Sequence, residues 1–119
     1  MLRNYKDLNV WQKAYHFCLD VYRLTRNFPK EENFYMVSQM RRAAISVPSN
    51  IAEGYGRKTT KEYIQFLYIA YGSLCEVETQ ILLSGDLGFI KAEDLDGLQK
   101  DLGDVERLLK ALIRSLEKT

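Results

Sequence analysis

Histidine and cysteine, which often serve as the base and nucleophile of a catalytic site, are scarce in this chain. The sequence contains one histidine, His16, and two cysteines, Cys18 and Cys75. If the surrounding segment is helical, His16 and Cys18 point about 200° apart and cannot act as a catalytic pair. His16 and Asp20 are four residues apart and could share a hydrogen bond, but no nucleophile accompanies them. We therefore expect no catalytic residues and no enzymatic activity.

Side chains that could hold a metal or a cofactor are also poorly spaced. One histidine and two distant cysteines do not make a zinc site. Glu76 and Glu78 diverge on a helix, and no histidine is available to complete the Glu-x-x-His pairs of di-iron bundles. Gly54-Tyr55-Gly56 lacks the preceding strand and the spacing of a phosphate-binding loop. The sequence predicts neither a metal site nor a cofactor.

Charged residues are distributed unevenly, although the formal net charge is only +1. Residues 1–30 carry net +4, whereas residues 62–90 contain no Lys or Arg and carry net −4. Suppose that the chain before and after residue 58 forms two helices that pack antiparallel about a turn near that residue. Positions whose residue numbers sum to about 116 then lie side by side. This arithmetic predicts a structural ion-pair network between helices, formed by Arg41, Arg42, Glu76 and Glu78. The alternative is that some of these arginines face outward and bind phosphate.

The chain that must position these residues divides into four helical segments. Breaks are expected at residues 27–33, 54–56 and 85–88, which contain Pro, Gly, Asn and Asp. Between the breaks, apolar residues recur at steps of three and four; in segment four they are Leu95, Leu98, Leu102, Val105, Leu109, Leu112 and Leu116. Thr59 or Thr60 with Glu62 has the character of a capping box. Short connections then predict an all-α, antiparallel up-down-up-down four-helix bundle, with the second helix kinked near Pro48.

Segments one and three carry more apolar surface than a single bundle core requires. Each has a second apolar stripe, rich in the aromatic residues that are common in interface cores. We therefore expect a homo-oligomer, with candidate interface residues Trp11, Tyr15, Tyr22, Tyr68 and Tyr71. The alternative is a monomer with a thick core.

The size of the chain, 119 residues, suits one domain that spans residues 1–119. No run of about 18 apolar residues is present, so no membrane span is expected. Two cysteines far apart, without an export signal, are typical of reduced thiols in a cytoplasmic protein.

One long run of residues resembles the signature of a known family. The run from Ser38 to Gly54, SQMRRAAISVPSNIAEG, followed by Gly56-Arg57, is similar to the 23S rRNA intervening-sequence proteins. The agreement begins near Leu8 and continues through Glu62-Tyr63, Phe66-Leu67, Ala70, Gly72-Ser73-Leu74 and Glu76-Val77-Glu78. Phe34-Tyr35-Met36 departs from the Tyr-Gly-Leu-like start that we expect for the second helix.

The resemblance implies a four-helix bundle that assembles into a homopentameric ring. The family resemblance also extends to the accessory protein of diversity-generating retroelements. That relative is a basic pentamer that engages nucleic acid and a reverse transcriptase. We therefore expect a non-enzymatic binding or scaffold protein whose partner is RNA or DNA. Its candidate phosphate contacts are Arg3, Lys6, Lys13, Arg57, Lys58 and Lys61. The alternative is a purely protein-binding assembly module.

Overall fold

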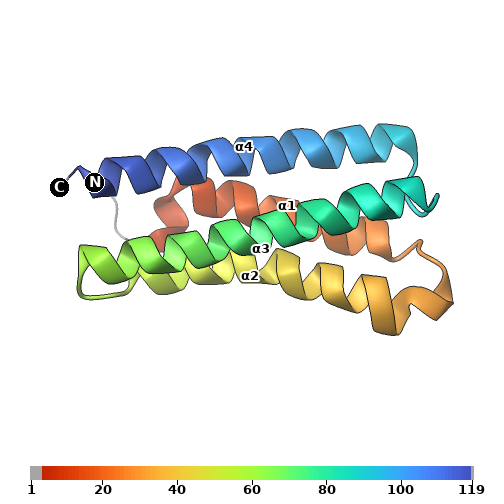
Figure 1. The fold of residues 1–119 in the computed structure, drawn as a ribbon, viewed down its shortest axis with the longest axis horizontal. Helices are drawn as coiled ribbons and strands as arrows, with labels where there is room; N and C mark the ends of the chain where they lie inside the picture. The colour runs from red at the N-terminus through yellow and green to blue at the C-terminus, as the bar shows by residue number, and fades with distance from the viewer. Residues whose placement is uncertain (1–3, 119) are drawn as a thin grey trace.

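The computed structural model describes residues 4–118, and four long α-helices account for most of them (Figure 1). The helices are α1 (Asn9–Thr25), α2 (Ser38–Tyr55), α3 (Thr60–Asp86) and α4 (Ala92–Glu117). A short 3₁₀ turn, Tyr5–Asp7, precedes α1. A 3₁₀ turn, Lys30–Glu32, and a π-helical turn, Asn33–Val37, connect α1 to α2. The all-α fold class is confirmed.

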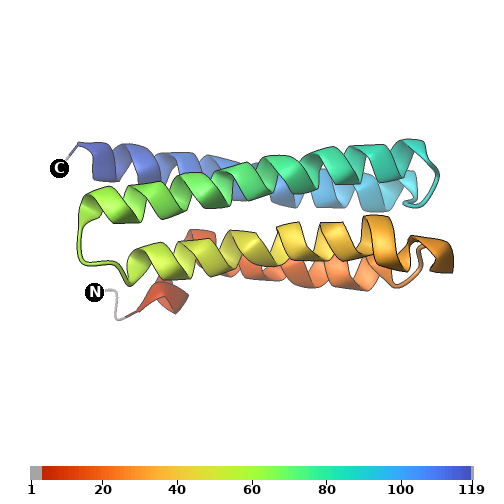
Figure 2. The same ribbon diagram turned by 60° about the horizontal axis from the view of Figure 1, so that its bottom comes forward.

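The helices run antiparallel in chain order, so the bundle is up-down-up-down (Figures 1 and 2). Ser73 of α3 donates to Ser46 of α2, and Tyr71 of α3 donates to Glu106 of α4. The molecule is elongated, with principal extents of 46 × 25 × 21 Å. One end holds the α2–α3 turn together with the start of α1 and the end of α4, and the other holds the α1–α2 and α3–α4 connections (Figure 1).

Helix α2 passes through Pro48 without a break, so the proline does not split this helix (Figure 1). Proline lacks a backbone N–H, and its ring crowds the preceding turn. Its side chain is buried in the bundle. The departure at Phe34-Tyr35-Met36 falls in the π-helical turn before α2, where Phe34 is 89% exposed and Tyr35 is 66% exposed.

The turn between α2 and α3 is short and well capped. The Thr59 hydroxyl accepts from the Glu62 backbone N–H at 3.1 Å and donates to the Glu62 carboxylate at 3.0 Å, which confirms the capping-box prediction. At Gly54 the two helices approach closely, because an added Cβ would lie 2.8 Å from Cβ of Phe66. This close approach fixes the start of the α2–α3 contact.

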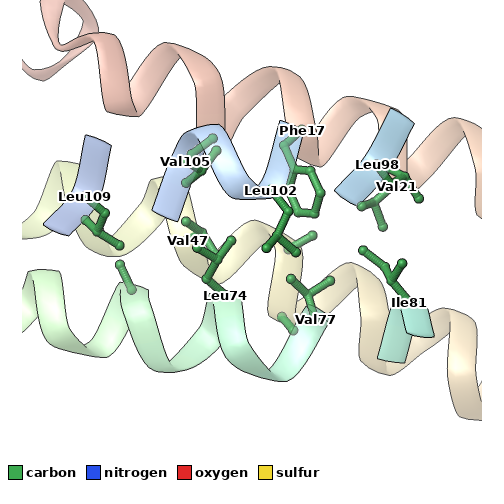
Figure 3. Packing of buried hydrophobic residues seen from close by; sticks show 14 of the residues in the cluster. Phe17, Val21, Val47, Leu74, Val77, Ile81, Leu98, Leu102, Val105 and Leu109 are labelled. Atoms are coloured by element: carbon green, nitrogen blue, oxygen red, sulfur yellow. The ribbon is translucent and has the colours of Figure 1, made fainter. Parts of the chain in front are cut away.

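The core is a single apolar cluster to which all four helices contribute (Figure 3). The predicted stripes supply its centre, where Phe17, Val47, Leu74 and Val105 are at most 1% exposed. The second stripes behave differently: Trp11 and Tyr71 are only partly buried, and Tyr15 and Tyr68 are exposed. Among residues 4–118, no helix has the length and apolar character needed to cross a membrane.

Candidate functional site

Arg41 does not take part in the predicted ion-pair network. Its guanidinium faces α1, where Nε donates to the Thr25 hydroxyl at 2.9 Å and Nη2 donates to the Tyr22 carbonyl at 3.2 Å. The guanidinium carbon also lies 4.6 Å from the centre of the Tyr22 ring. The buried Thr25 hydroxyl in turn donates to the Val21 carbonyl at 2.7 Å. Arg41 therefore links α2 to the C-terminal turn of α1 by hydrogen bonds, and it also covers the predicted interface residue Tyr22.

The register of α2 against α3 does not by itself separate the predicted pairs. Ser46 pairs with Ser73 at 2.8 Å, and Met40 accepts a long contact from Ser84 at 3.5 Å. These paired positions sum to 119 and 124 rather than 116, a register that still leaves Arg42 level with Glu78. The pairs are absent because the Arg41 guanidinium faces α1 and Arg42 is exposed. Within residues 4–118, no ion pair joins Arg41 or Arg42 to Glu76 or Glu78. Correspondingly, the Glu76 carboxylate accepts from the Gln80 amide of its own helix at 3.4 Å.

Polar side chains recur at steps of three and four along α2 and its C-terminal turn and form a polar stripe that contacts α3 or the same helix: Ser46, Asn50, Glu53 and Arg57. The Asn50 amide donates to both the hydroxyl and the carbonyl of Ser46, and Ser73 donates to the same hydroxyl. Arg57, predicted as a phosphate contact, pairs with Glu53 at 3.3 Å and lies over the Phe66 ring at 4.6 Å. The arginine and amide side chains of this stripe therefore serve local packing and register.

Unpaired basic side chains gather at the end of the bundle that holds the α2–α3 turn. Lys58 and Lys61 are exposed there, and Lys6 lies in the 3₁₀ turn at the same end (Figure 1). Arg114 and Lys118, which sequence reasoning missed, reach this end because α4 returns to it. Lys13 lies apart from this group, on the α1–α4 side beside Asp101, and Arg3 lies outside the described residues.

Charge is separated along the long axis of the molecule. The half containing the α2–α3 turn (residues 4–16, 47–73 and 105–118) has nine basic and five acidic side chains, net +4. The other half (residues 17–46 and 74–104) has seven basic and eleven acidic side chains, net −4. In the acidic half, burial and the nearby carboxylates of Asp20 and Asp104 raise the pKa of Asp101. The two ends of the bundle therefore present opposite charge to a partner.

An aromatic and aliphatic groove of about 310 Å³ runs between α1 and α2. The Trp11 ring stacks on Tyr15 at 5.0 Å between centres and meets Tyr5 edge-on at 5.3 Å. Leu19 and Ile45 complete the exposed apolar surface and are 37% and 43% exposed. Two of the predicted interface residues, Trp11 and Tyr15, are brought together here.

A second, smaller groove of about 240 Å³ lies between α3 and α4 near the basic end. Tyr68 and Tyr71 form one wall, and Lys110, Arg114 and Glu117 lie on the other. The Tyr68 hydroxyl donates to Glu117 at 3.2 Å, and the negative charge of Glu117 raises the pKa of Tyr68. Lys110 pairs with Glu106 at 3.2 Å and lies 5.3 Å from the centre of the Tyr71 ring. This groove combines exposed aromatic surface with cations.

The histidine and the cysteines are not brought together. His16 is exposed and meets Tyr15 edge-on at 6.0 Å. Cys18 is half-buried, and burial raises the pKa of its thiol, whereas Cys75 is exposed on α3. Among the described residues, no group of three His, Cys, Asp or Glu side chains is arranged to hold a metal ion.

These features define an antiparallel four-helix bundle whose candidate functional surfaces are two grooves and a charged end. The model of the 23S rRNA-intervening sequence protein family matches residues 6–111, and the chain belongs to this family. No curated protein matches the sequence.

The fold is shared with a solved relative. The crystal structure of a protein of unknown function from the S23 ribosomal protein family of Bacteroides thetaiotaomicron has a TM-score of 0.79 and 24% sequence identity to this chain. The match covers 87% of this chain and 97% of that one. At this level of identity the likeness concerns the fold alone.

Proposed function

We propose that this protein is a non-enzymatic, homo-oligomeric helical-bundle scaffold of the cytoplasm that binds RNA or DNA through phosphate contacts. The observation that carries the proposal is the basic end, where Lys6, Lys58, Lys61, Arg114 and Lys118 gather although the chain is almost neutral overall. Lys and Arg side chains supply affinity for phosphate without reading sequence. The expected binding is therefore salt-sensitive and tolerant of sequence.

Self-association is supported by apolar surface that the monomer does not cover. A head-to-tail ring requires two different contact faces on each subunit. The groove between α1 and α2 supplies one. The outer side of α3 supplies another, because Ile69, Leu83 and Leu87 are each about half exposed in a segment without basic residues. We propose a closed ring of these contacts, with five subunits as the family resemblance implies.

The ring would strengthen binding to a polyanion. One subunit presents few unpaired cations, and a phosphate chain that contacts several subunits benefits from their effective concentration. Because all subunits of a cyclic ring point the same way along its axis, each basic end that reaches a rim is repeated on that rim. Binding should therefore require the intact oligomer.

The charge proposal is tested with a labelled single-stranded RNA at low salt. The variant Lys58→Glu, Lys61→Glu reverses two charges at the basic end, and Lys30→Glu, Lys91→Glu makes the same net change at the other end. We expect the first variant to lose binding and the second to retain most of it. Equal loss in both would indicate that net charge alone matters, and no binding by the wild type at tens of micromolar would reject a nucleic-acid partner.

Self-association is tested by sedimentation of the wild type, Tyr15→Glu and Tyr35→Glu. Tyr15 is 46% exposed beside the α1–α2 groove, and Tyr35 is 66% exposed at the opposite end from the α2–α3 turn. We expect Tyr15→Glu to dissociate with its helix content intact, and Tyr35→Glu to remain assembled. A wild type that sediments as a 13.9 kDa species at micromolar concentration would contradict the proposal.

The second candidate function is a purely protein-binding assembly module, which the apolar groove between α1 and α2 favours. Salt separates the two candidates. A complex held by phosphate contacts loses affinity steeply as salt rises, whereas an apolar protein interface does not.

A further inference from the structure

We propose that the groove between α3 and α4 holds an unpaired base of single-stranded nucleic acid, stacked on Tyr68. The proposal rests on the nucleic-acid binding proposed above and adds a preference for single strands over duplexes. Phosphate contacts alone would favour the duplex, if either form, because its charge density along the axis is higher. Stacking favours the single strand, because only an unpaired base can offer its face to a side chain.

The Tyr68 ring is available and held in place. The residue is 51% exposed, and its hydroxyl donates to Glu117 of the facing helix at 3.2 Å. This hydrogen bond ties the ring to α4 across the groove. A fixed ring loses little conformational freedom when a base stacks on it.

The surface of α3 next to Tyr68 is open at the edge of the groove. Gly72 follows Tyr68 by four residues and thus lies on the same side of α3. An added Cβ at Gly72 would meet no atom within 4 Å, so the backbone here is uncovered. The groove volume of about 240 Å³ lies below the roughly 300–1,000 Å³ typical of sites for drug-sized ligands. It therefore suits a single planar group rather than a segment of another protein.

Cations flank this ring on both helices. Lys61 precedes Tyr68 by seven residues, two turns along the same side of α3, and it is exposed. Arg114 lines the groove from α4 and is exposed as well. If a base stacked on Tyr68, the neighbouring phosphates would be attracted by the unpaired cations of Lys61 and Arg114. The groove between α1 and α2 has aromatic rings but an apolar lining, so it lacks this charge complementarity.

The test compares three ligands and three variants. The ligands are a mixed-sequence single-stranded RNA, the duplex of the same length, and inorganic polyphosphate, which has the charge without bases. Tyr68→Leu removes the ring, and Tyr68→Phe keeps the ring but removes the bond to Glu117. Tyr35→Leu is the matched control, an exposed tyrosine at the other end of the bundle.

We expect Tyr68→Leu to weaken single-stranded RNA binding by about 5- to 150-fold, which corresponds to about 1–3 kcal/mol for one stacked base. Binding of duplex and polyphosphate should change less than twofold. Tyr35→Leu should bind single-stranded RNA as the wild type does, and Tyr68→Phe should bind it somewhat more weakly than the wild type but more tightly than Tyr68→Leu, because the ring remains but is no longer tied to Glu117. A Tyr68→Leu variant that binds all three ligands like the wild type would overturn the stacking proposal and leave the phosphate proposal standing. Equal weakening for RNA and polyphosphate would also overturn it.

A second variant keeps the test valid if Tyr68→Leu is poorly folded or dissociates. Gly72→Leu adds a side chain in open space at a helical position, which favours the helix and places an aliphatic group beside Tyr68 on the same side of α3, in the path of a base that stacks there. It should reduce binding of single-stranded RNA and leave polyphosphate binding unchanged; unchanged RNA binding would overturn the proposal. If the wild type binds neither RNA nor polyphosphate, the proposed function fails, and stacking fails with it.

Discussion

Replacing Arg41 should destabilise the bundle far more than replacing Arg42, its neighbour in the sequence. Arg41 donates to the Thr25 hydroxyl and the Tyr22 carbonyl, and it covers the Tyr22 ring. Arg42 is exposed and makes no ion pair or hydrogen bond with any described residue. Both arginines lie on α2, so the pair isolates the contacts to α1 from any general effect of charge.

The size of the effect follows from these contacts. A hydrogen bond from a charged donor contributes about 1.5–3 kcal/mol to stability, and a cation over an exposed ring adds about 0.5–1 kcal/mol. The two donors of one guanidinium are not additive, and the Arg41 side chain is only partly buried. We therefore expect Arg41→Met to lower the free energy of unfolding by about 2–3 kcal/mol. Arg42→Met should lower it by less than about 0.5 kcal/mol.

Denaturant unfolding at one fixed protein concentration measures both variants, since the stability of an oligomer depends on concentration. Thr25→Val provides the partner deletion, because it removes the hydroxyl that accepts from Arg41. If the Arg41–Thr25 hydrogen bond stabilises the bundle, Thr25→Val should lower the free energy of unfolding less in the Arg41→Met background than in the wild type. Equal stability of Arg41→Met and Arg42→Met, within about half a kcal/mol, would refute this reasoning.

Three further predictions concern packing and pH. Gly54→Ala should destabilise the bundle by about 1–3 kcal/mol because its Cβ would lie 2.8 Å from Cβ of Phe66. Gly103→Ala, in open space on α4, should stabilise it by about 0.5–1 kcal/mol. Thermal unfolding of both variants checks these two expectations. Burial raises the pKa of Tyr63 to about 12. The stability that the neutral Tyr63 phenol contributes to the folded state is therefore complete below pH 10 and is lost as the pH rises to 12. Tyr63→Phe should flatten that part of the stability curve. Phe17→Ala, at a position 1% exposed, should cost about 3–5 kcal/mol in denaturant unfolding.

Hydrophobic spacing predicted the helices and most of the core. Because the pattern of three- and four-residue steps reports directly which side of a helix faces inward, it placed Leu98, Leu102 and Val105 correctly. The register between helices depends on something the pattern does not contain, the path of the turn. The α2–α3 turn and the close approach at Gly54 set a sum of about 120 instead of 116. That register still leaves Arg42 level with Glu78, so the predicted pairs fail because of side-chain direction: Arg41 faces α1, and Arg42 is exposed.

Thr25 was the signal that could have located the partner of Arg41. It follows Val21 by four residues, so a hydroxyl occupies a position that the stripe assigns to the core. A buried hydroxyl needs a hydrogen-bonding partner, and an antiparallel α2 is the nearest source of one. Gln80 raises the same question, since its side-chain oxygen is buried with no hydrogen-bond partner among the described residues.

The basic end could have been predicted from topology but not from a count of charges along the sequence. Residues 91–119 carry six basic and seven acidic side chains, net −1, so the charge of this segment as a whole does not reveal the two basic residues near its end, Arg114 and Lys118. An up-down-up-down order returns the end of α4 to the α2–α3 turn, beside Lys58 and Lys61 (Figure 2).

The two grooves suit different partners, and this difference would allow the proposed assembly and the proposed nucleic-acid binding to coexist. The α1–α2 groove is apolar, so a second copy of the chain can bury it without desolvating unpaired charge. The α3–α4 groove contains Lys110, Arg114 and Glu117, and burying it against protein would require each of these charges to be compensated. The proposed assembly through the first groove would leave the second open at the basic end. A Tyr15 variant that dissociates should therefore lose most of its affinity for a long RNA, and whatever binding remains should keep the Tyr68-dependent preference for single strands.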